Sequence, residues 1–254
     1  MSCSVLILAR NEQKHIKDCI ESCRSFADEV VVVDDFSTDD TKKIAEGLGA
    51  KVVQRSMKGN WGDQQTFAIE QATCDWIFFI DADERCTPEL AAEVQSVKET
   101  KEYFAYWVKR INHFNRKRVR FGVLSPDWVV RLMPRKGSYV TGYVHPKLWY
   151  EVPEKKARNA MLHYTYDTWA QYESKMNKYS TLAARKYFEE GKKSRYVFDV
   201  VCRPLFSFLK MYILKLGFLD GALGFALSVN YTSYTLAKYF KLSELNKASR
   251  SSNP

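Results

Sequence analysis

The chain has 254 residues, of which 46% are hydrophobic and 27% are charged. These values exclude a largely disordered chain and allow one large domain, or one domain with an appendage. The net charge of +9 is unevenly spread: residues 1–154 hold 22 Lys and Arg against 23 Asp and Glu, whereas residues 155–254 hold 17 against 7. The basic excess lies in the C-terminal hundred residues and indicates an anionic partner for them.

The N-terminus and the cysteines bear on two further classes. The first eight residues contain no basic segment, and Arg10, Asn11 and Glu12 end their apolar run, so we predict a strand and no signal peptide. The six cysteines form no C-x-x-C pair, and no histidine cluster completes a zinc set. We therefore expect reduced thiols and a cytoplasmic protein.

The first third of the chain alternates short apolar runs with helical patterns. Strands are predicted at 5–8, 30–33, 51–54 and 76–80, and helices around 16–23, 41–48, 60–72 and 88–97. Because these strands are apolar on both faces and are separated by helices, we expect a parallel sheet that is covered on both sides. Residues 103–150 are strand-like and rich in loops, and the chain is predicted to be helical from about residue 168.

Three of the predicted strands end in polar or acidic loops: Arg10-Asn11-Glu12, Asp34-Asp35 and Asp81-Ala82-Asp83-Glu84. Ligands of parallel sheets bind at the carboxyl ends of the strands, so we expect these loops to converge on one site. Two carboxylates in a D-x-D pattern at a strand end suit one divalent cation, Mn²⁺ or Mg²⁺, which in turn clamps a diphosphate. A nucleotide-sugar needs such help because its leaving group is a nucleoside diphosphate. A solvated, helix-capping acidic loop is the alternative.

The same segments resemble a known family. Residues 8–12 (LARNE), 31–41 (VVVDDFSTDDT) and 75–84 (DWIFFIDADE) look like the three signature blocks of family-2 inverting glycosyltransferases, in order and spacing. The resemblance covers about the first 150 residues. It implies an α/β, GT-A fold (a Rossmann-like, mostly parallel sheet with helices on both faces), followed here by a helical C-terminal region. A narrower likeness, to bacterial lipopolysaccharide-core β-glucosyltransferases, rests on four segments: 67–72, 127–132, 144–145 and 217–221.

The resemblance implies a role for each matching residue. Asp34 or Asp35 would accept the ring N–H of a uracil or thymine base, and Asp83 would ligate the metal, with Asp81 beside it. The other donor-binding positions are Ala9, Asn11 and Glu12 at the nucleotide, Asp81 and Ala82 near the ribose and sugar, Gln65 at the sugar or base, and Arg131 at the diphosphate.

An inverting transferase also needs a base to deprotonate the acceptor hydroxyl. In relatives this is an acidic residue that follows the D-x-D motif, which favours Asp127, with His145 as the second candidate. Relatives often have Glu directly after that His, whereas this chain has Pro146. A turn-forming aspartate and a packed histidine are the alternatives.

The C-terminal stretch 204–240 is apolar but is interrupted by Lys210, Lys215 and Asp220. It therefore lacks the run of about 18 apolar residues that predicts a spanning helix. Glycines at 217, 221 and 224 are predicted to break it into two helices. Its mixture of Tyr, Phe and Lys, with the basic segment 192–195 upstream, favours helices that lie on an anionic membrane, at the inner face of the cytoplasmic membrane. The alternative is a helix pair packed on the catalytic domain or on another subunit, as in a homo-oligomer.

We thus predict a GT-A catalytic domain over 1–160, a helical, basic and aromatic region over 161–248, and a frayed tail over 249–254. The predicted activity is transfer of a hexose, glucose or similar, from a UDP-sugar to a lipopolysaccharide-core or other lipid-linked glycan. A nucleotidyltransferase is a rival, but it would need a glycine-rich loop where residues 9–12 stand. A nucleic-acid-binding protein would leave the acidic strand ends unexplained, so we expect no nucleic-acid partner.

Overall fold

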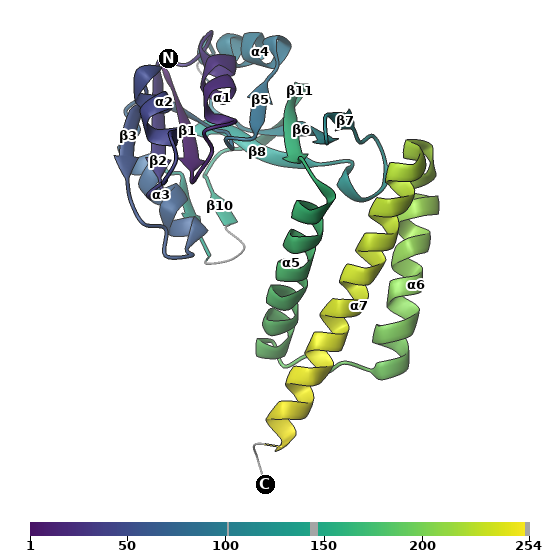
Figure 1. Cartoon of the computed structure of the whole chain (residues 1–254). Coiled ribbons are helices and arrows are strands. Elements are labelled where there is room, and N and C mark those ends of the chain that lie inside the picture. The colour runs from purple at the N-terminus through teal and green to yellow at the C-terminus, as the bar shows by residue number, and fades with distance from the viewer. Residues whose placement is uncertain (101, 143–146, 252–254) are drawn as a thin grey trace. The chain divides into compact units, whose positions relative to one another are not determined.

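The computed structural model describes residues 1–100, 102–142 and 147–251. The chain forms two compact units, which Figure 1 shows as ribbons. The first unit comprises Met1–Ile111 and Asp127–His163, and the second comprises Asn112–Pro126 and Tyr164–Pro254. Each unit has apolar clusters of its own, which lie on both faces of the sheet in the first unit and among the helices in the second.

The first unit is built on a mixed sheet. Its strands are β1 Cys3–Ala9, β2 Glu29–Asp34, β3 Lys51–Gln54, β4 Trp76–Phe79, β5 Glu84–Cys86, β6 Ala105–Phe114, β8 Trp128–Pro134 and β11 Glu154–Tyr166. The strand order is β3-β2-β1-β4-β8-β6-β11-β5. The strands β3, β2, β1 and β4 are parallel, as predicted. Beyond β4 the pairings of β8 with β4 and β6, and of β5 with β11, are antiparallel.

Helices cover both faces of the sheet, which confirms the predicted α/β class. They are α1 Ile16–Cys23, α2 Thr41–Gly47, α3 Trp61–Gln71 and α4 Pro88–Lys98. Successive residues of β1 point to opposite faces. Val5 joins the cluster that contains Ile20 of α1, whereas Leu6 joins the cluster that contains Ala68 of α3. All four residues are buried, so both faces of β1 lie in apolar cores.

Capping residues fix the starts of two helices at the positions that the sequence predicts. The side chain of Asn60 accepts a hydrogen bond from the N–H of Asp63 at the start of α3. The hydroxyl of Thr87 accepts from the N–H of Leu90, and Pro88 occupies the first position of α4. These contacts satisfy backbone donors that a helix start otherwise leaves without partners.

β11 is a strand that the sequence pattern does not predict, and the predicted domain boundary at 160 lies in its middle. Its buried residues do not alternate regularly, because one end of the strand is exposed. His163 of β11 pairs with Glu84, which the sequence analysis placed in the acidic loop. Glu84 instead begins β5 and is fully buried. The acidic segment is therefore paired with a second strand, β11, which the sequence pattern does not predict.

The second unit consists of a hairpin segment and helices. Its main helices are α5 Trp169–Glu189, α6 Arg203–Phe208 and α7 Gly221–Ser251, joined through the π-helical turns η2 Tyr196–Cys202 and η3 Leu209–Leu214. α7 lies beside both α5 and α6 (Figure 1). The strand β7, Lys117–Arg118, pairs with β6 and forms a hairpin at the basic run 116–120. Phe114 and Val119 of this segment pack with Tyr172 and Leu227, which is why residues 112–126 belong with the helices.

Two glycines allow the chain to reverse direction between η3 and α7, through the short helix η4, Gly217–Asp220. A Cβ on Gly224 would lie 1.9 Å from the carbonyl oxygen of Gly217, and a Cβ on Gly217 would lie 2.6 Å from that of Met211. Gly224 was predicted to break the helical stretch. That prediction is wrong, because Gly224 lies inside α7. α7 also includes residues 249–251, which were expected to belong to a frayed tail.

Within the part of the chain that the structure describes, no single helix is long and apolar enough to cross a membrane. One helix pair, Val197–Leu214 with Gly217–Ser249, meets the criteria of length and composition when its two parts are taken together, and it is bent by 68°.

Candidate active site

The loops that follow β1 and β2 are joined by hydrogen bonds. The N–H of Asn11 donates to Ser37 Oγ at 2.8 Å, and Asn11 Oδ1 accepts from the N–H of Thr38 at 2.8 Å. The N–H of Glu12 donates to Thr41 Oγ1 at 2.7 Å. Asn11 has a φ of 57°, a left-handed conformation that asparagine tolerates better than most residues. The predicted convergence of these two loops is therefore present.

The two aspartates at the end of β2 have different surroundings. Asp34 is fully buried, and its carboxylate accepts from the N–H and hydroxyl of Ser37 and from Gln54 Nε2 at 3.0 Å. Asp35 lies closer to the surface and accepts from the N–H of Met57 at 3.0 Å and from Arg10 Nη1 at 3.0 Å. Asp34 thus holds the loop in shape, whereas the side chain of Asp35 is largely buried but 11% exposed.

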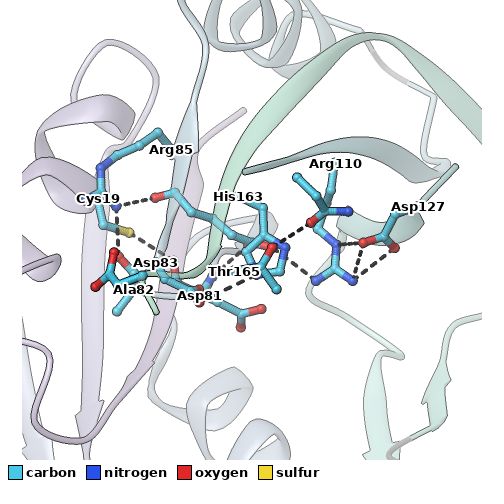
Figure 2. Close-up of polar contacts among 12 residues, drawn as sticks. Cys19, Asp81, Ala82, Asp83, Arg85, Arg110, Asp127, His163 and Thr165 are labelled. Carbon is cyan, nitrogen blue, oxygen red and sulfur yellow. Dashed lines mark hydrogen bonds and ion pairs between the residues drawn. The ribbon is translucent and has the colours of Figure 1, made fainter. Parts of the chain in front are cut away.

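The third loop, Asp81-Ala82-Asp83, follows β4 at the same edge of the sheet, next to β1. Ala82 is buried, while the side chains of Asp81 and Asp83 are 47% and 26% exposed. Asp83 Oδ2 lies 3.5 Å from Nε2 of His163 on β11 (Figure 2). The two carboxylates are therefore accessible at the carboxyl end of β4, as the sequence predicts.

A row of alternating acidic and basic side chains extends from Asp81 to Asp127. Arg131 Nη2 donates to Asp81 Oδ2 at 2.6 Å and to Glu84 Oε1 at 2.5 Å. Arg110 Nη1 donates to Glu84 Oε1 at 3.3 Å. The Nε and Nη2 of Arg110 reach the two oxygens of Asp127 at 2.8 and 3.0 Å (Figure 2). Strands β4, β6 and β8 thus bring together three predicted residues, Asp81, Arg131 and Asp127.

The row shifts the pKa values of its members in opposite directions. Desolvation by the surrounding protein opposes ionisation of Asp81, although its side chain is 47% exposed. The charge and hydrogen bond of Arg131 outweigh this effect and hold the pKa of Asp81 below its ordinary value. Burial raises the pKa of Glu84, although Arg131 partly offsets this effect. Burial likewise disfavours the charged form of Arg131, yet Asp81 and Glu84 raise its pKa, so this guanidinium stays charged.

Carboxylates outnumber guanidinium groups at this site. The acidic members are Asp81, Asp83, Glu84 and Asp127, and the basic members are Arg110 and Arg131. Arg85 also donates to the backbone carbonyls of Ala82 and Glu84, and its charge is paired with Asp18. When these acidic and basic members are all ionised, they leave an excess of two negative charges, which is the charge that one divalent cation balances. In the described ranges, no group of three or more His, Cys, Asp or Glu side chains is arranged to hold a metal ion. Asp83 and His163 offer two ligand types, so a bound diphosphate would have to supply others.

A cavity of about 480 Å³ adjoins the row and is lined by two of the predicted residues, Gln65 and Arg131. Trp107 and Trp128 also line it, with Tyr150 and Glu154. Trp107 Nε1 and the hydroxyl of Tyr150 both donate to the carboxylate of Glu154, at 2.9 and 2.5 Å. The cavity falls within the size range of small-molecule sites, and its aromatic lining is typical of them.

Several residues of the site were not predicted from the sequence. His163 lies on the strand that was not predicted, and Arg110 and the two tryptophans lie on β6 and β8, in the segment that looked loop-rich. Their spacing along the chain has no period, because antiparallel strands bring them together. The only cue was the presence of buried-type aromatic residues near charged ones. His145, the second candidate base, lies outside the described residues.

The family of this chain follows from a match to a protein-family model. The family model described as glycosyl transferase family 2 matches residues 4–162. The chain belongs to glycosyl transferase family 2. The match includes the three loops, the acidic–basic row and most of β11, and it confirms the family that the sequence motifs resemble.

Relatives of this glycosyltransferase extend over both units. It is 31% identical over 266 residues to an uncharacterized glycosyltransferase of Rickettsia bellii (strain RML369-C), covering 99% of this chain and 88% of the relative. It is also 31% identical over 226 residues to the lipopolysaccharide core biosynthesis glycosyltransferase LpsC of Rhizobium meliloti (strain 1021), covering 82% and 80%. The narrower likeness to lipopolysaccharide-core glycosyltransferases is therefore confirmed. Among solved structures, S. aureus TarS 1–349 in complex with UDP matches with a TM-score of 0.47 at 16% identity, covering 100% of this chain and 92% of that chain.

Proposed function

We propose that this glycosyltransferase is a metal-dependent, inverting enzyme that moves a hexose from a UDP-sugar to a lipopolysaccharide-core or other lipid-linked glycan. The observation that carries the proposal is the set of four carboxylates, which outnumbers the guanidinium groups of Arg110 and Arg131 beside the convergent loops of β1, β2 and β4. A divalent cation and the diphosphate of a nucleotide-sugar neutralise each other and would bind together at such an edge.

Asp35 is our candidate for recognition of the base. A carboxylate accepts the ring N–H of uracil, and the carboxylate of Asp35 lies nearer the surface than that of the fully buried Asp34. Ala9, Asn11 and Glu12 would form the adjacent wall of the nucleotide pocket, because their loop is tied to the loop that follows Asp35. This arrangement supports UDP as the nucleotide of the donor.

Asp83 and His163 would hold the cation, with Asp81 next to them. A mixed carboxylate and imidazole set favours Mn²⁺ over Mg²⁺, which prefers oxygen ligands. When bound, the cation would neutralise the charge that develops on the leaving diphosphate. Arg131 lines the cavity, and its Nε has no hydrogen-bond partner within the described part of the chain. A buried donor in this position supports contact between Arg131 and the diphosphate.

Asp127 is our candidate for the base that deprotonates the acceptor hydroxyl. Arg110 fixes the orientation of the Asp127 carboxylate through its Nε and Nη2. The acceptor oxygen would then attack the sugar from the face opposite the leaving nucleoside diphosphate. Asp127→Asn retains an oxygen that can accept from Arg110, so UDP binding should persist while transfer falls about 10²–10⁴-fold. Near-normal transfer by this variant, with intact UDP binding, would exclude Asp127.

The hexose and the lipid-linked acceptor rest on separate observations. Trp107 and Trp128 line the cavity that Arg131 also lines, and the faces of indole rings suit the apolar faces of a hexose. The name of the LpsC relative supports a lipopolysaccharide-core acceptor. The basic excess of residues 155–254 supports a peripheral position on an anionic membrane, at the inner face of the cytoplasmic membrane.

A donor-hydrolysis screen tests this proposal, because many transferases slowly hydrolyse their own donor when no acceptor is present. We expect UDP-hexoses to be hydrolysed fastest, with Mn²⁺ restoring activity after chelation. We also expect UDP with Mn²⁺ to raise the melting temperature, since a ligand of the folded state stabilises it. Stabilisation by ATP instead would favour a nucleotidyltransferase, and stabilisation by an oligonucleotide would favour a nucleic-acid-binding protein.

A further inference from the structure

The second unit contains a basic pocket that the donor and acceptor chemistry does not use. It is a cavity of about 330 Å³ between the end of α5, the turn η2 with the start of α6, and α7. Four cationic and two aromatic side chains line it: Lys192, Lys193, Arg195, Arg203, Tyr187 and Tyr239. We call this cavity the basic pocket.

A buried carboxylate positions the arginines of the basic pocket. Asp199 is 4% exposed, and it accepts from Arg203 Nε at 2.6 Å and from the N–H of Arg195 at 2.7 Å. The Nε of Arg195 faces the same carboxylate at 3.7 Å. The side chains of Arg195 and Arg203 are 68% and 45% exposed. Because Asp199 faces Nε in both, their terminal nitrogens can bind a further acceptor, as in phosphate sites.

Cations exceed anions around the basic pocket. The four cationic side chains meet two carboxylates, Asp199 and Glu190, the latter 2.7 Å from Lys192. The excess of two positive charges is about the charge of a phosphate monoester and more than that of a diester. Beside the pocket, Lys238 lies over the ring of Tyr239. Burial, and then Arg203 and Lys192, lower the pKa of Lys238, which is a sign of crowded positive charge.

Exposed apolar side chains occupy the same segment as the arginines. The following residues of η2 and α6 are each at least 45% exposed: Val197, Phe198, Val201, Leu205 and Phe206. Phe198 packs under the guanidinium groups of Arg195 and Arg203, at 4.6 and 5.2 Å from its ring centre. A soluble phosphate needs no such apolar surroundings, whereas a lipid offers both a phosphate and acyl chains.

We propose that the basic pocket binds the phosphate of an anionic membrane lipid, while the apolar side chains of η2 and α6 enter the membrane interface. This inference deepens the membrane part of the proposed function and rests on it. Charge complementarity commits the surface to an anionic lipid rather than to a second copy of this chain, which would bring like charges together.

Flotation of the full chain with vesicles tests the proposal. Vesicles of phosphatidylcholine alone are compared with vesicles that also contain phosphatidylglycerol. The pocket variant is Lys193→Gln with Arg195→Gln. Its matched control, Lys178→Gln with Arg185→Gln, removes one exposed lysine and one exposed arginine from α5 outside the pocket. We expect wild type to float only with phosphatidylglycerol, the pocket variant to partition at least about tenfold less, and the control to change less than about threefold.

A third variant tests the apolar side chains. Leu205→Ser retains every charge of the pocket, and we expect it to lower partition as well. Equal losses in the pocket variant and its control would overturn the pocket as the lipid site, because general charge attraction would then explain binding. Failure of wild type to float, with or without self-association, would also overturn it. Stabilisation by inorganic phosphate that depends on Arg195, without vesicle binding, would overturn a lipid as the ligand.

Hydrolysis of UDP-sugar in the absence of vesicles separates this inference from the donor chemistry. All three variants should keep wild-type hydrolysis, since none of their residues lies in the first unit. Normal hydrolysis without flotation overturns the lipid site alone. Flotation without hydrolysis of any nucleotide-sugar contradicts the proposed donor and leaves the lipid site supported. Helix content by circular dichroism confirms that the second unit of each variant is folded.

Discussion

The two units handle charge in opposite ways. In the first unit, Glu84 and Arg131 are buried and belong to a row in which each charged group has a partner of opposite sign. In the second unit, the cations outnumber the acids, Arg195 is 68% exposed, and large apolar side chains such as Leu205 are exposed with it. Burying a charge without a partner costs several kcal/mol. The buried charges of the first unit are therefore held in place by partners of opposite sign. The charges of the second unit stay available for an external surface.

The largest effect that separates the units should come from removing one arginine from each. Arg131→Met leaves the carboxylates of Asp81 and Glu84 without their main partner, and we expect it to lower the free energy of unfolding by about 3–5 kcal/mol. Arg195→Met removes an exposed cation, and we expect a loss of less than about 1 kcal/mol. Urea unfolding of both variants measures the difference. Similar losses of unfolding free energy would mean that the buried and the exposed arginine contribute equally to stability.

The next effect concerns activity and distinguishes the two ends of one strand. Asp83 follows β4 at the proposed metal site, and Asp75 precedes the same strand at its opposite end. We expect Asp83→Asn to lower sugar transfer about 10²–10³-fold at an unchanged melting temperature, because charge on the leaving diphosphate is no longer offset. Asp75→Asn is the matched control and should transfer within about twofold of wild type. Activity of Asp83→Asn that persists at saturating Mn²⁺ would contradict the assignment.

A smaller effect should distinguish the backbone packing of the second unit from that of the first. Gly224 of α7 allows no Cβ, because that atom would lie 1.9 Å from the carbonyl oxygen of Gly217. We expect Gly224→Ala to lower the free energy of unfolding by about 1–3 kcal/mol through overpacking. Gly47→Ala is the control in α2, where no atom lies within 4 Å of the added Cβ, and it should be neutral or slightly stabilising. Chemical denaturation, followed by circular dichroism, measures both.

The sequence predicted the parallel half of the first unit because each element there is local. The apolar runs, the helical patterns between them and the acidic loops all signal structure within a few neighbouring residues. The rule that ligands bind at the carboxyl ends of parallel strands then placed Asp34, Asp35, Asp81 and Asp83 at one edge.

The antiparallel half could not be read in the same way. β11 has one exposed end and no regular alternation, so its pattern resembles a loop. His163 reaches Asp83 only because β11 pairs with β5. In that pairing His163 lies opposite Glu84, which is 79 residues earlier in the chain. The excess charge of the C-terminal part was visible in composition alone. The grouping of four cations around Asp199 depends on contact between α5 and α7, which no local pattern specifies.

The smallest effect is a pH dependence that belongs to the first unit alone. The pKa of Glu84 is raised by burial, so between the ordinary glutamate pKa and this raised value the folded protein binds a proton more readily than the unfolded chain. Stability due to Glu84 therefore increases as the pH falls through this window. Glu84→Gln lacks this titration, and we expect the stability of wild type relative to it to rise by about 1 kcal/mol as the pH falls through the window. In the second unit, burial opposes ionisation of Asp199, but the N–H of Arg195 and the side chain of Arg203 lower its pKa. The contribution of Asp199 to stability is complete above pH 5, so the unfolding free energy of Asp199→Asn should change with pH as that of wild type does. Urea unfolding at each pH measures this dependence. A pH dependence that changes in Asp199→Asn but not in Glu84→Gln would reverse the contrast between the buried row and the exposed pocket.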